Sequence, residues 1–150
     1  MRSLLEWRAG VVGIADGKPL GFKHLPQLSG EGASRGRAIL KLFGGAPEGA
    51  ADHFRRALGI RPTRLAFWDC ALDPTWVSEM RGKNLLLTET KMENMIDRIA
   101  GVAEHPRNTE RVPASARFEF RLTLKVVDGE ELLPDLLRGL RLLELTGIGG

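Results

Sequence analysis

The stretch from residue 116 to residue 127, Ala-Arg-Phe-Glu-Phe-Arg-Leu-Thr-Leu-Lys-Val-Val, decides the fold class of this chain. Within it every second residue is apolar, which is the two-residue period of a half-buried strand. The alternating apolar positions are Phe118, Phe120, Leu122, Leu124 and Val126. We therefore predict a strand over 116–127 with one face in the core and the other facing solvent or a ligand.

A helix and a second strand are predicted on either side of this stretch. After the turn at Asp128-Gly129, a leucine stripe with helical spacing begins at Glu130 and ends before Gly147. Its members are Leu132, Leu133, Leu136, Leu137, Leu140 and Leu143. Residues 64–72 alternate in the same way as 116–127 and lie between Pro62 and Asp73-Pro74, which predicts the partner strand. Strands mixed with helices in this order predict an α+β domain.

The first part of the chain is predicted to be helical at intervals. Residues 2–8 have helix-forming composition, and residues 34–43 and 50–58 place apolar side chains at helical spacing. Between the first two of these, residues 10–34 are rich in glycine and proline and have no sustained periodicity, which is typical of a loop. We therefore interpret 10–61 as a loop and helical insertion.

Composition excludes several classes of protein. The chain has 150 residues, 43% hydrophobic and 27% charged, which suits a single globular domain over 1–150. It has no apolar run long enough to span a bilayer, and residues 1–7 do not form a signal peptide. Its single cysteine, Cys70, cannot form an internal disulfide or a cysteine-rich zinc site. We expect a cytoplasmic protein with no membrane partner.

Positive charge is concentrated in the first half of the chain. Residues 1–64 contain 11 Lys or Arg against 5 acidic residues, whereas 65–150 contain 11 against 14. Arginine makes planar contacts with phosphates and bases better than lysine does, and 16 of the 22 basic residues are arginine. GC-rich coding also increases arginine content, so this composition permits nucleic-acid binding without establishing it.

A glycine-rich segment is one candidate for anion binding. Residues 30–36, Gly-Glu-Gly-Ala-Ser-Arg-Gly, open a predicted helix and could hold a phosphate at its N-terminus. The segment lacks the Gly-Lys-Ser/Thr ending of a P-loop, and no strand precedes it. An insertion loop is the simpler interpretation.

Other reactive side chains give little indication of a metal or catalytic site. The histidines lack a second ligand at i+3 or i+4 and are expected on the surface: they are His24, His53 and His105. Asp69 ends a predicted strand and Asp73 precedes a proline, which is a turn position that acids favour. Cys70 has no nearby histidine base and is expected to pack in a buried strand.

Several segments together resemble a known family. They are Met1-Arg2-Ser3-Leu4-Leu5-Glu6, Leu42-Phe43-Gly44, Phe67-Trp68-Asp69-Cys70-Ala71, and the ordered series 88–98, 106–114 and 118–120. These segments resemble the RNA-cleaving backbone subunit of type III-A CRISPR effector complexes, the Csm group of the RAMP superfamily. The ordered series, which begins Thr-Glu-Thr-Lys-Met-Glu-Asn, is the most specific part of the resemblance.

The resemblance implies a fold and an RNA-binding region. The fold would be a ferredoxin-like or RNA-recognition-type (RAMP) domain in which 78–115 contains a thumb, a β-hairpin that crosses the guide RNA and its target. The residues expected to contact guide RNA are Lys91, Asn94, Arg98, Arg107 and Arg111. Judged by charge alone, this region could equally be a salt-bridged surface, since 89–121 has six basic and six acidic residues.

The departures from the family pattern lead to a further expectation. Family members begin with a strand, a loop that holds the aspartate implicated in cleavage, and a G-S-S-x-K-G loop, and none of these precedes Met1 in the sequence. The glycines at 147–150 resemble the start of a loop leading to a last strand. We therefore expect a truncated domain with no catalytic residue of its own. The resemblance implies Mg²⁺ or Mn²⁺ for cleavage by the intact protein, and we expect no metal site in this fragment.

The function implied by the resemblance is antiviral defence. The intact protein would assemble with other copies of itself and other Csm-type subunits along a CRISPR RNA, and would cut bound target RNA at regular intervals as an endonuclease. Two alternatives stay open. One is a non-catalytic RNA-binding and assembly subunit, and the other is an unrelated phosphate-binding module that uses residues 30–36.

Overall fold

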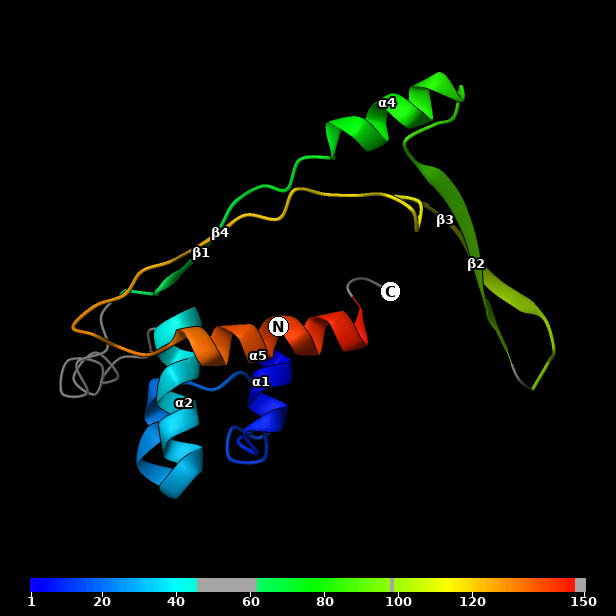
Figure 1. The fold of residues 1–150 in the computed structure, drawn as a ribbon. Helices are drawn as coiled ribbons and strands as arrows, with labels where there is room; N and C mark the ends of the chain where they lie inside the picture. Colours follow the sequence, from blue (N-terminus) through cyan, green and yellow to red (C-terminus); the bar gives the residue numbers. More distant parts are fainter. Residues whose placement is uncertain (46–61, 98, 148–150) are drawn as a thin grey trace. The chain divides into compact units, whose positions relative to one another are not determined.

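The structure, a computed structural model, describes residues 1–45, 62–97 and 99–147 (Figure 1). Its elements are α1 Arg2–Arg8, the 3-10 helix η1 Phe22–Gln27, α2 Gly30–Phe43, β1 Leu65–Phe67, α4 Pro74–Gly82, β2 Glu89–Ile96, β3 Ala103–Arg111, β4 Leu122–Leu124 and α5 Leu133–Thr146. Helices and small antiparallel sheets make this an α+β protein, as predicted. The helix predicted over 50–58 lies outside the described residues.

The chain forms two compact units. Unit 1 comprises Met1–Phe67 and Leu122–Gly150, and unit 2 comprises Trp68–Arg121. Unit 1 contains α1, η1, α2, β1, β4 and α5, whereas unit 2 contains α4 and the β2–β3 pair. Among the described residues, no helix is both long enough and apolar enough to cross a membrane.

The sheet of unit 1 is the predicted antiparallel strand pair. Strand β1 pairs with β4, with Leu65 opposite Leu124 and Phe67 opposite Leu122. Because side chains alternate between the faces of a strand, Leu65, Leu122 and Leu124 share one face. That face contributes to a hydrophobic cluster with residues of α2 and of α5 and its N-cap. The buried members of the cluster are Ala38, Leu42, Leu65, Leu132 and Leu136.

The predicted core face of 116–127 was correct only at its centre. Leu122 and Leu124 pack against the buried cluster, whereas Phe118, Phe120 and Val126 are 48%, 57% and 61% exposed. Regular pairing in unit 1 covers only Leu122–Leu124, and Phe118 makes an isolated bridge to Leu72 in unit 2. Alternation therefore predicted which side chains share a face, but burial also requires a layer packed over that face.

The leucine stripe of α5 is also only partly buried. Leu132 and Leu136 are buried and Leu140 packs against them, but Leu133 and Leu137 are about half exposed. The buried leucines are spaced four apart and lie on one side of the helix. Helix α5 also packs against α1, where a Cβ at Gly139 would lie 2.8 Å from Cγ of Met1.

The glycine- and proline-rich segment supplies a second hydrophobic cluster. Its buried members are Val11, Leu20, Phe22, Leu25 and Leu40. The prediction of a loop over 10–34 was wrong where η1 forms and where α2 begins, at Gly30 rather than Ser34. Tertiary packing outweighs the low helix propensity of glycine here. Gly36 fits this packing, because a Cβ there would lie 2.6 Å from Cδ1 of Leu28.

An ion-pair network around the buried Arg64 joins three parts of unit 1. Arg64, only 2% exposed, donates from Nε to Oε2 of Glu130 at 2.9 Å, and Lys41 Nζ lies 2.7 Å from Oε1 of the same carboxylate. Arg64 also donates to the Pro62 carbonyl at 2.6 Å. Hydrogen bonds from Arg64 and Lys41 lower the pKa of Glu130 from 4.5 to about 2. The network ties the start of β1 to α2 and to the turn before α5.

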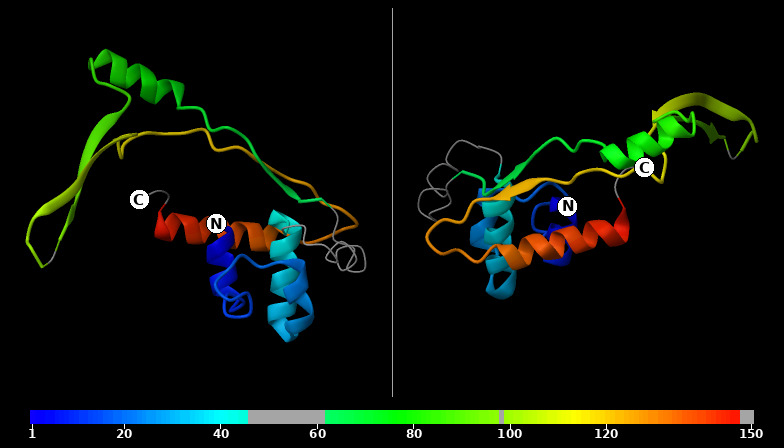
Figure 2. Two further views of the ribbon diagram at one scale, coloured as in Figure 1. Left: turned by 180° about the vertical axis from the view of Figure 1, so that it is seen from behind. Right: turned by 45° about the horizontal axis from the view of Figure 1, so that its top comes forward.

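Helix α4 of unit 2 begins at a side-chain cap. The Asp73 carboxylate accepts the backbone N–H of Trp76 at 2.8 Å, and Pro74 occupies the first turn, where its missing N–H carries no cost. Trp76 is the one fully buried side chain among the described residues of unit 2. The other side chains of unit 2 whose burial the structure describes are half-buried or exposed. Figures 1 and 2 show α4 followed along the chain by the β2–β3 hairpin.

Candidate nucleic-acid interface

The candidate RNA-binding residues lie on a two-stranded antiparallel hairpin. Strands β2 and β3 pair with Glu89 opposite Arg111 and Glu93 opposite Arg107. The connection between them is stabilised locally, because the Asp97 carboxylate accepts the N–H groups of Ile99 at 2.7 Å and Ala100 at 3.2 Å. These hydrogen bonds lower the pKa of Asp97. The structure thus contains a hairpin within the region where the resemblance implied one.

The register of the hairpin gathers charge on one face. Residues 89, 91 and 93 alternate along β2 and therefore point to the same side, and their cross-strand neighbours on β3 share that side. We call this side the charged face and define it by Glu89, Lys91, Glu93, Arg107 and Arg111. Three of the five predicted RNA contacts, Lys91, Arg107 and Arg111, are therefore brought together.

The remaining two predicted contacts do not join this set. Asn94 falls on the other side of β2, which we call the opposite face, together with Thr90, Met92 and the cross-strand Asn108 and Glu110. Arg98 lies outside the described residues. Asn94 and Met92 are exposed, so the opposite face presents an amide and a thioether to solvent.

Ion pairs neutralise part of the charged face. Arg111 Nε lies 2.7 Å from Oε1 of Glu89, and Lys91 forms an ion pair with Glu93. The hydrogen bond from Lys91 and its charge lower the pKa of Glu93, with smaller effects from Arg111 and Arg107. The salt-bridged surface that the charge balance indicated is thus present in the unbound hairpin. Because all four paired side chains are partly or largely exposed, these ion pairs contribute little to the stability of the hairpin.

A β-bulge lies in the middle of the hairpin. The register shifts between Glu93 and Met95, so that His105 and Pro106 on β3 together face Asn94 on β2. His105 has a φ of 49° and is exposed, as expected for a surface histidine. A bulge bends its strand and increases the local twist. Beside it lies a hollow of 260 Å³, lined by Glu93, Asn94, Met95, His105 and Arg107.

The alternative candidate sites receive less support. Residues 30–36 are helical from Gly30 onwards, so the loop interpretation of this segment was wrong. Asp73 caps a helix, and Asp69 is exposed. The expectation of a buried Cys70 was also wrong: β1 ends at Phe67, and Cys70 lies exposed beyond it.

Across 1–45, 62–97 and 99–147, no three His, Cys, Asp or Glu side chains are grouped to hold a metal ion. None of the described residues is therefore assigned to the Mg²⁺ or Mn²⁺ that the resemblance implies for the intact protein.

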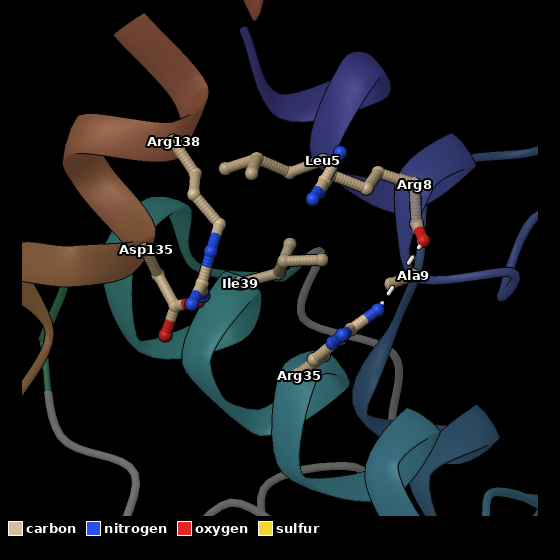
Figure 3. A pocket seen from close by; sticks show the side chains of 7 residues that line it. All are labelled: Leu5, Arg8, Ala9, Arg35, Ile39, Asp135 and Arg138. Carbon is tan, nitrogen blue, oxygen red and sulfur yellow. Dashed lines mark hydrogen bonds and ion pairs between the residues drawn. The ribbon is translucent and has the colours of Figure 1, made fainter. Parts of the chain in front are cut away.

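Sequence reasoning missed an arginine cluster in unit 1. Arg8, Arg35 and Arg138 come from α1, α2 and α5 and surround a small cavity that is also lined by Leu5 and Ile39 (Figure 3). Arg35 pairs with Glu31, and Arg138 Nη1 lies 2.8 Å from Oδ1 of Asp135. The cavity volume is 20 Å³, enough for about one water molecule. These arginines are far apart in sequence, and the space between them is too small for a nucleotide.

Comparisons with known proteins identify the relatives of the chain. No protein-family model matches it. The Enterococcus italicus protein named CRISPR system Cms endoribonuclease Csm3 is 32% identical over the whole chain and 60% of its own length. Proteins of the same name are 30% identical in Methanocaldococcus jannaschii, over the whole chain and 54% of that protein, and 35% identical in Mycobacterium tuberculosis, over 65% of the chain and 49% of that protein.

These matches confirm the family resemblance seen in the sequence motifs. The chain is a relative of Csm3, the type III-A CRISPR protein. It spans 49–60% of the length of these three relatives. The activity and the partners of the whole protein therefore belong to the proposal that follows.

Proposed function

We propose that the chain is part of the backbone subunit of a type III-A CRISPR effector complex and that its hairpin binds guide RNA. The observation that carries the proposal is the similarity to Csm3 proteins along the whole chain, combined with a hairpin whose register gathers three cations on one face. The corresponding fold would be a RAMP domain of ferredoxin-like type, with the β2–β3 hairpin as its thumb.

The hairpin suits RNA for two reasons. Lys91, Arg107 and Arg111 can neutralise phosphates, which supply much of the affinity for nucleic acids. On the opposite face, Asn94 and Asn108 can donate and accept hydrogen bonds with the edges of unpaired bases, and Met92 offers an exposed apolar contact. Most of the described side chains on the two strands are exposed, which suits contact with a single strand of RNA.

Antiviral defence follows from this assignment. The partners of the proposed subunit are a CRISPR RNA, a target RNA, further copies of the same chain and other Csm-type subunits, and the cytoplasm is the compartment that the proposal requires. The relatives are named endoribonucleases. We extend RNA cleavage, supported by Mg²⁺ or Mn²⁺, to the intact protein and assign no step of it to the described residues. A nuclease assay on the assembled complex distinguishes this function from a non-catalytic assembly subunit.

The RNA-binding proposal is tested by the salt dependence of affinity. The affinity for a fluorescein-labelled single-stranded RNA of mixed sequence is measured by fluorescence anisotropy at several salt concentrations. Each neutralised phosphate contributes about 0.7 to the slope of log affinity against log salt, so the Arg107→Ala/Arg111→Ala double variant should lower the slope by about 1.4.

A matched control removes two arginines from unit 1. Arg138→Ala/Arg141→Ala changes the net charge equally on an exposed side of α5 and should leave the slope nearly unchanged. Equal slopes for the hairpin variant and the unmodified chain would contradict RNA binding by the hairpin.

A further inference from the structure

We infer that Glu89 and Glu93 compete with RNA phosphates for the cations of the charged face and thereby limit how tightly the hairpin holds RNA. This inference rests on the proposed RNA-binding function and adds a means of tuning affinity at the same site.

The geometry makes each carboxylate a substitute for a phosphate. Glu89 places Oε1 2.7 Å from Nε of Arg111, a distance typical of charge-assisted hydrogen bonds to carboxylate or phosphate oxygens. Glu93 forms an ion pair with Lys91 and lies directly opposite Arg107 in the register. An RNA phosphate that approaches these cations must displace a carboxylate oxygen before it can accept their hydrogen bonds.

The exposure of these pairs makes displacement possible. The side chains of Arg111 and Glu89 are 48% and 43% exposed, and those of Lys91 and Glu93 are 35% and 50% exposed. Ion pairs at this level of exposure are weak, so a phosphate can replace the carboxylate at a small cost. The competition therefore tunes affinity and does not prevent binding.

The opposite face provides a matched comparison. Glu110 lies there, opposite Thr90 in the register, and its carboxylate accepts a hydrogen bond from Thr88 Oγ1 at 2.6 Å. Replacing Glu110 by Gln removes the same unit of charge from the same hairpin without releasing a cation of the charged face. Any difference between the Glu→Gln variants on the two faces thus reports local competition rather than net charge.

The experiment measures RNA affinity for Glu89→Gln, Glu93→Gln and Glu110→Gln in the full 150-residue chain. The probe is the same labelled single-stranded RNA, and circular dichroism checks that each variant stays folded. We expect about 2- to 5-fold tighter binding for Glu89→Gln and for Glu93→Gln, and a smaller change for Glu110→Gln. The Lys91→Ala change should remove most of the gain from Glu93→Gln, because the released cation is then absent.

The outcomes separate this inference from the proposed function. In one outcome, the variants Glu89→Gln and Glu93→Gln bind RNA no more tightly than Glu110→Gln, while Arg107→Ala/Arg111→Ala still weakens RNA binding. The inferred competition is then wrong, and RNA binding by the hairpin stands. If the arginine variant also leaves affinity and salt slope unchanged, the proposed function itself is wrong. A gain from Glu93→Gln that survives Lys91→Ala would likewise overturn the competition at that pair.

Discussion

The two units of the chain are stabilised in different ways. Unit 1 buries two hydrophobic clusters and an ion-pair network around Glu130, whereas unit 2 has one fully buried side chain among its described residues, that of Trp76. The hairpin of unit 2 depends mainly on backbone hydrogen bonds, a local turn and exposed ion pairs. A two-stranded hairpin alone is only marginally stable in water.

The difference indicates a division between stability and binding. Side chains that are buried against each other cannot contact a ligand, and side chains left on a surface contribute little to the free energy of unfolding. The candidate RNA contacts that the structure describes all lie in unit 2. Substitutions should therefore separate into those that change stability and those that change binding, according to the unit in which they lie.

The largest effect on stability is expected when the ion-pair network around the buried Arg64 is broken. Glu130→Ala leaves Arg64, which is almost inaccessible to water, without its carboxylate partner. The free energy of unfolding should therefore fall by about 3 to 5 kcal/mol. Urea denaturation followed by circular dichroism measures this change. As a control, Glu144→Ala on the exposed side of α5 should cost less than about 1 kcal/mol. Equal losses for the two variants would contradict the role given to burial.

A pair of apolar substitutions tests the same contrast without charge. Leu40 is completely buried in α2, and Leu40→Ala should destabilise the chain by about 2 to 5 kcal/mol, since it leaves a cavity. Met92 is 78% exposed in β2, and Met92→Ala should change stability by less than about 0.5 kcal/mol. Urea denaturation of both variants checks the difference. A large loss from Met92→Ala would show that the hairpin packs against something in solution.

The sequence predicted local elements better than burial. Alternation correctly predicted a strand within 64–72 and another within 116–127, because the period of a strand is a local property, although regular pairing covers only Leu65–Phe67 and Leu122–Leu124. It could not predict that Phe118 and Phe120 stay exposed, since that depends on whether another layer covers them. Nor could it predict the burial of Val11 and Leu20, which come from an aperiodic segment and are placed by tertiary packing.

The candidate site shows the same limit. Charge counting indicated that the region around residues 89–121 was balanced, but only the register shows which charges share a face. Glu93 and Arg107 become neighbours because β3 returns antiparallel to β2, and Asn94 is separated from them by the alternation of the strand. The network around Glu130 was missed because its members Lys41 and Arg64 lie far away in sequence.

Acid should destabilise unit 1 through Glu130. The folded-state pKa of Glu130 is about 2, below its ordinary value of 4.5, so its contribution to stability is complete above pH 4.5 and is lost as the pH falls towards 2. This contribution is at most about 3 to 4 kcal/mol, at 1.36 kcal/mol for each unit of pKa. Urea denaturation across this pH range measures it. The Glu130→Gln variant should lose less stability on acidification than the unmodified chain, and identical pH profiles would contradict the assignment.

The smallest effect on stability is expected for the charged face. Arg111 pairs with Glu89 in an exposed setting, so Arg111→Ala should change the free energy of unfolding by less than about 1 kcal/mol. The same substitution should weaken binding of single-stranded RNA and lower its salt slope by about 0.7, because one phosphate contact is lost. Arg64→Ala in the buried network should do the reverse, with a large loss of stability and no change in salt slope under conditions where it stays folded. Urea denaturation and fluorescence anisotropy on the same two proteins provide the comparison. If Arg111→Ala unfolded the chain as readily as Arg64→Ala, the hairpin would be part of the stabilising core and the division between the two units would be wrong.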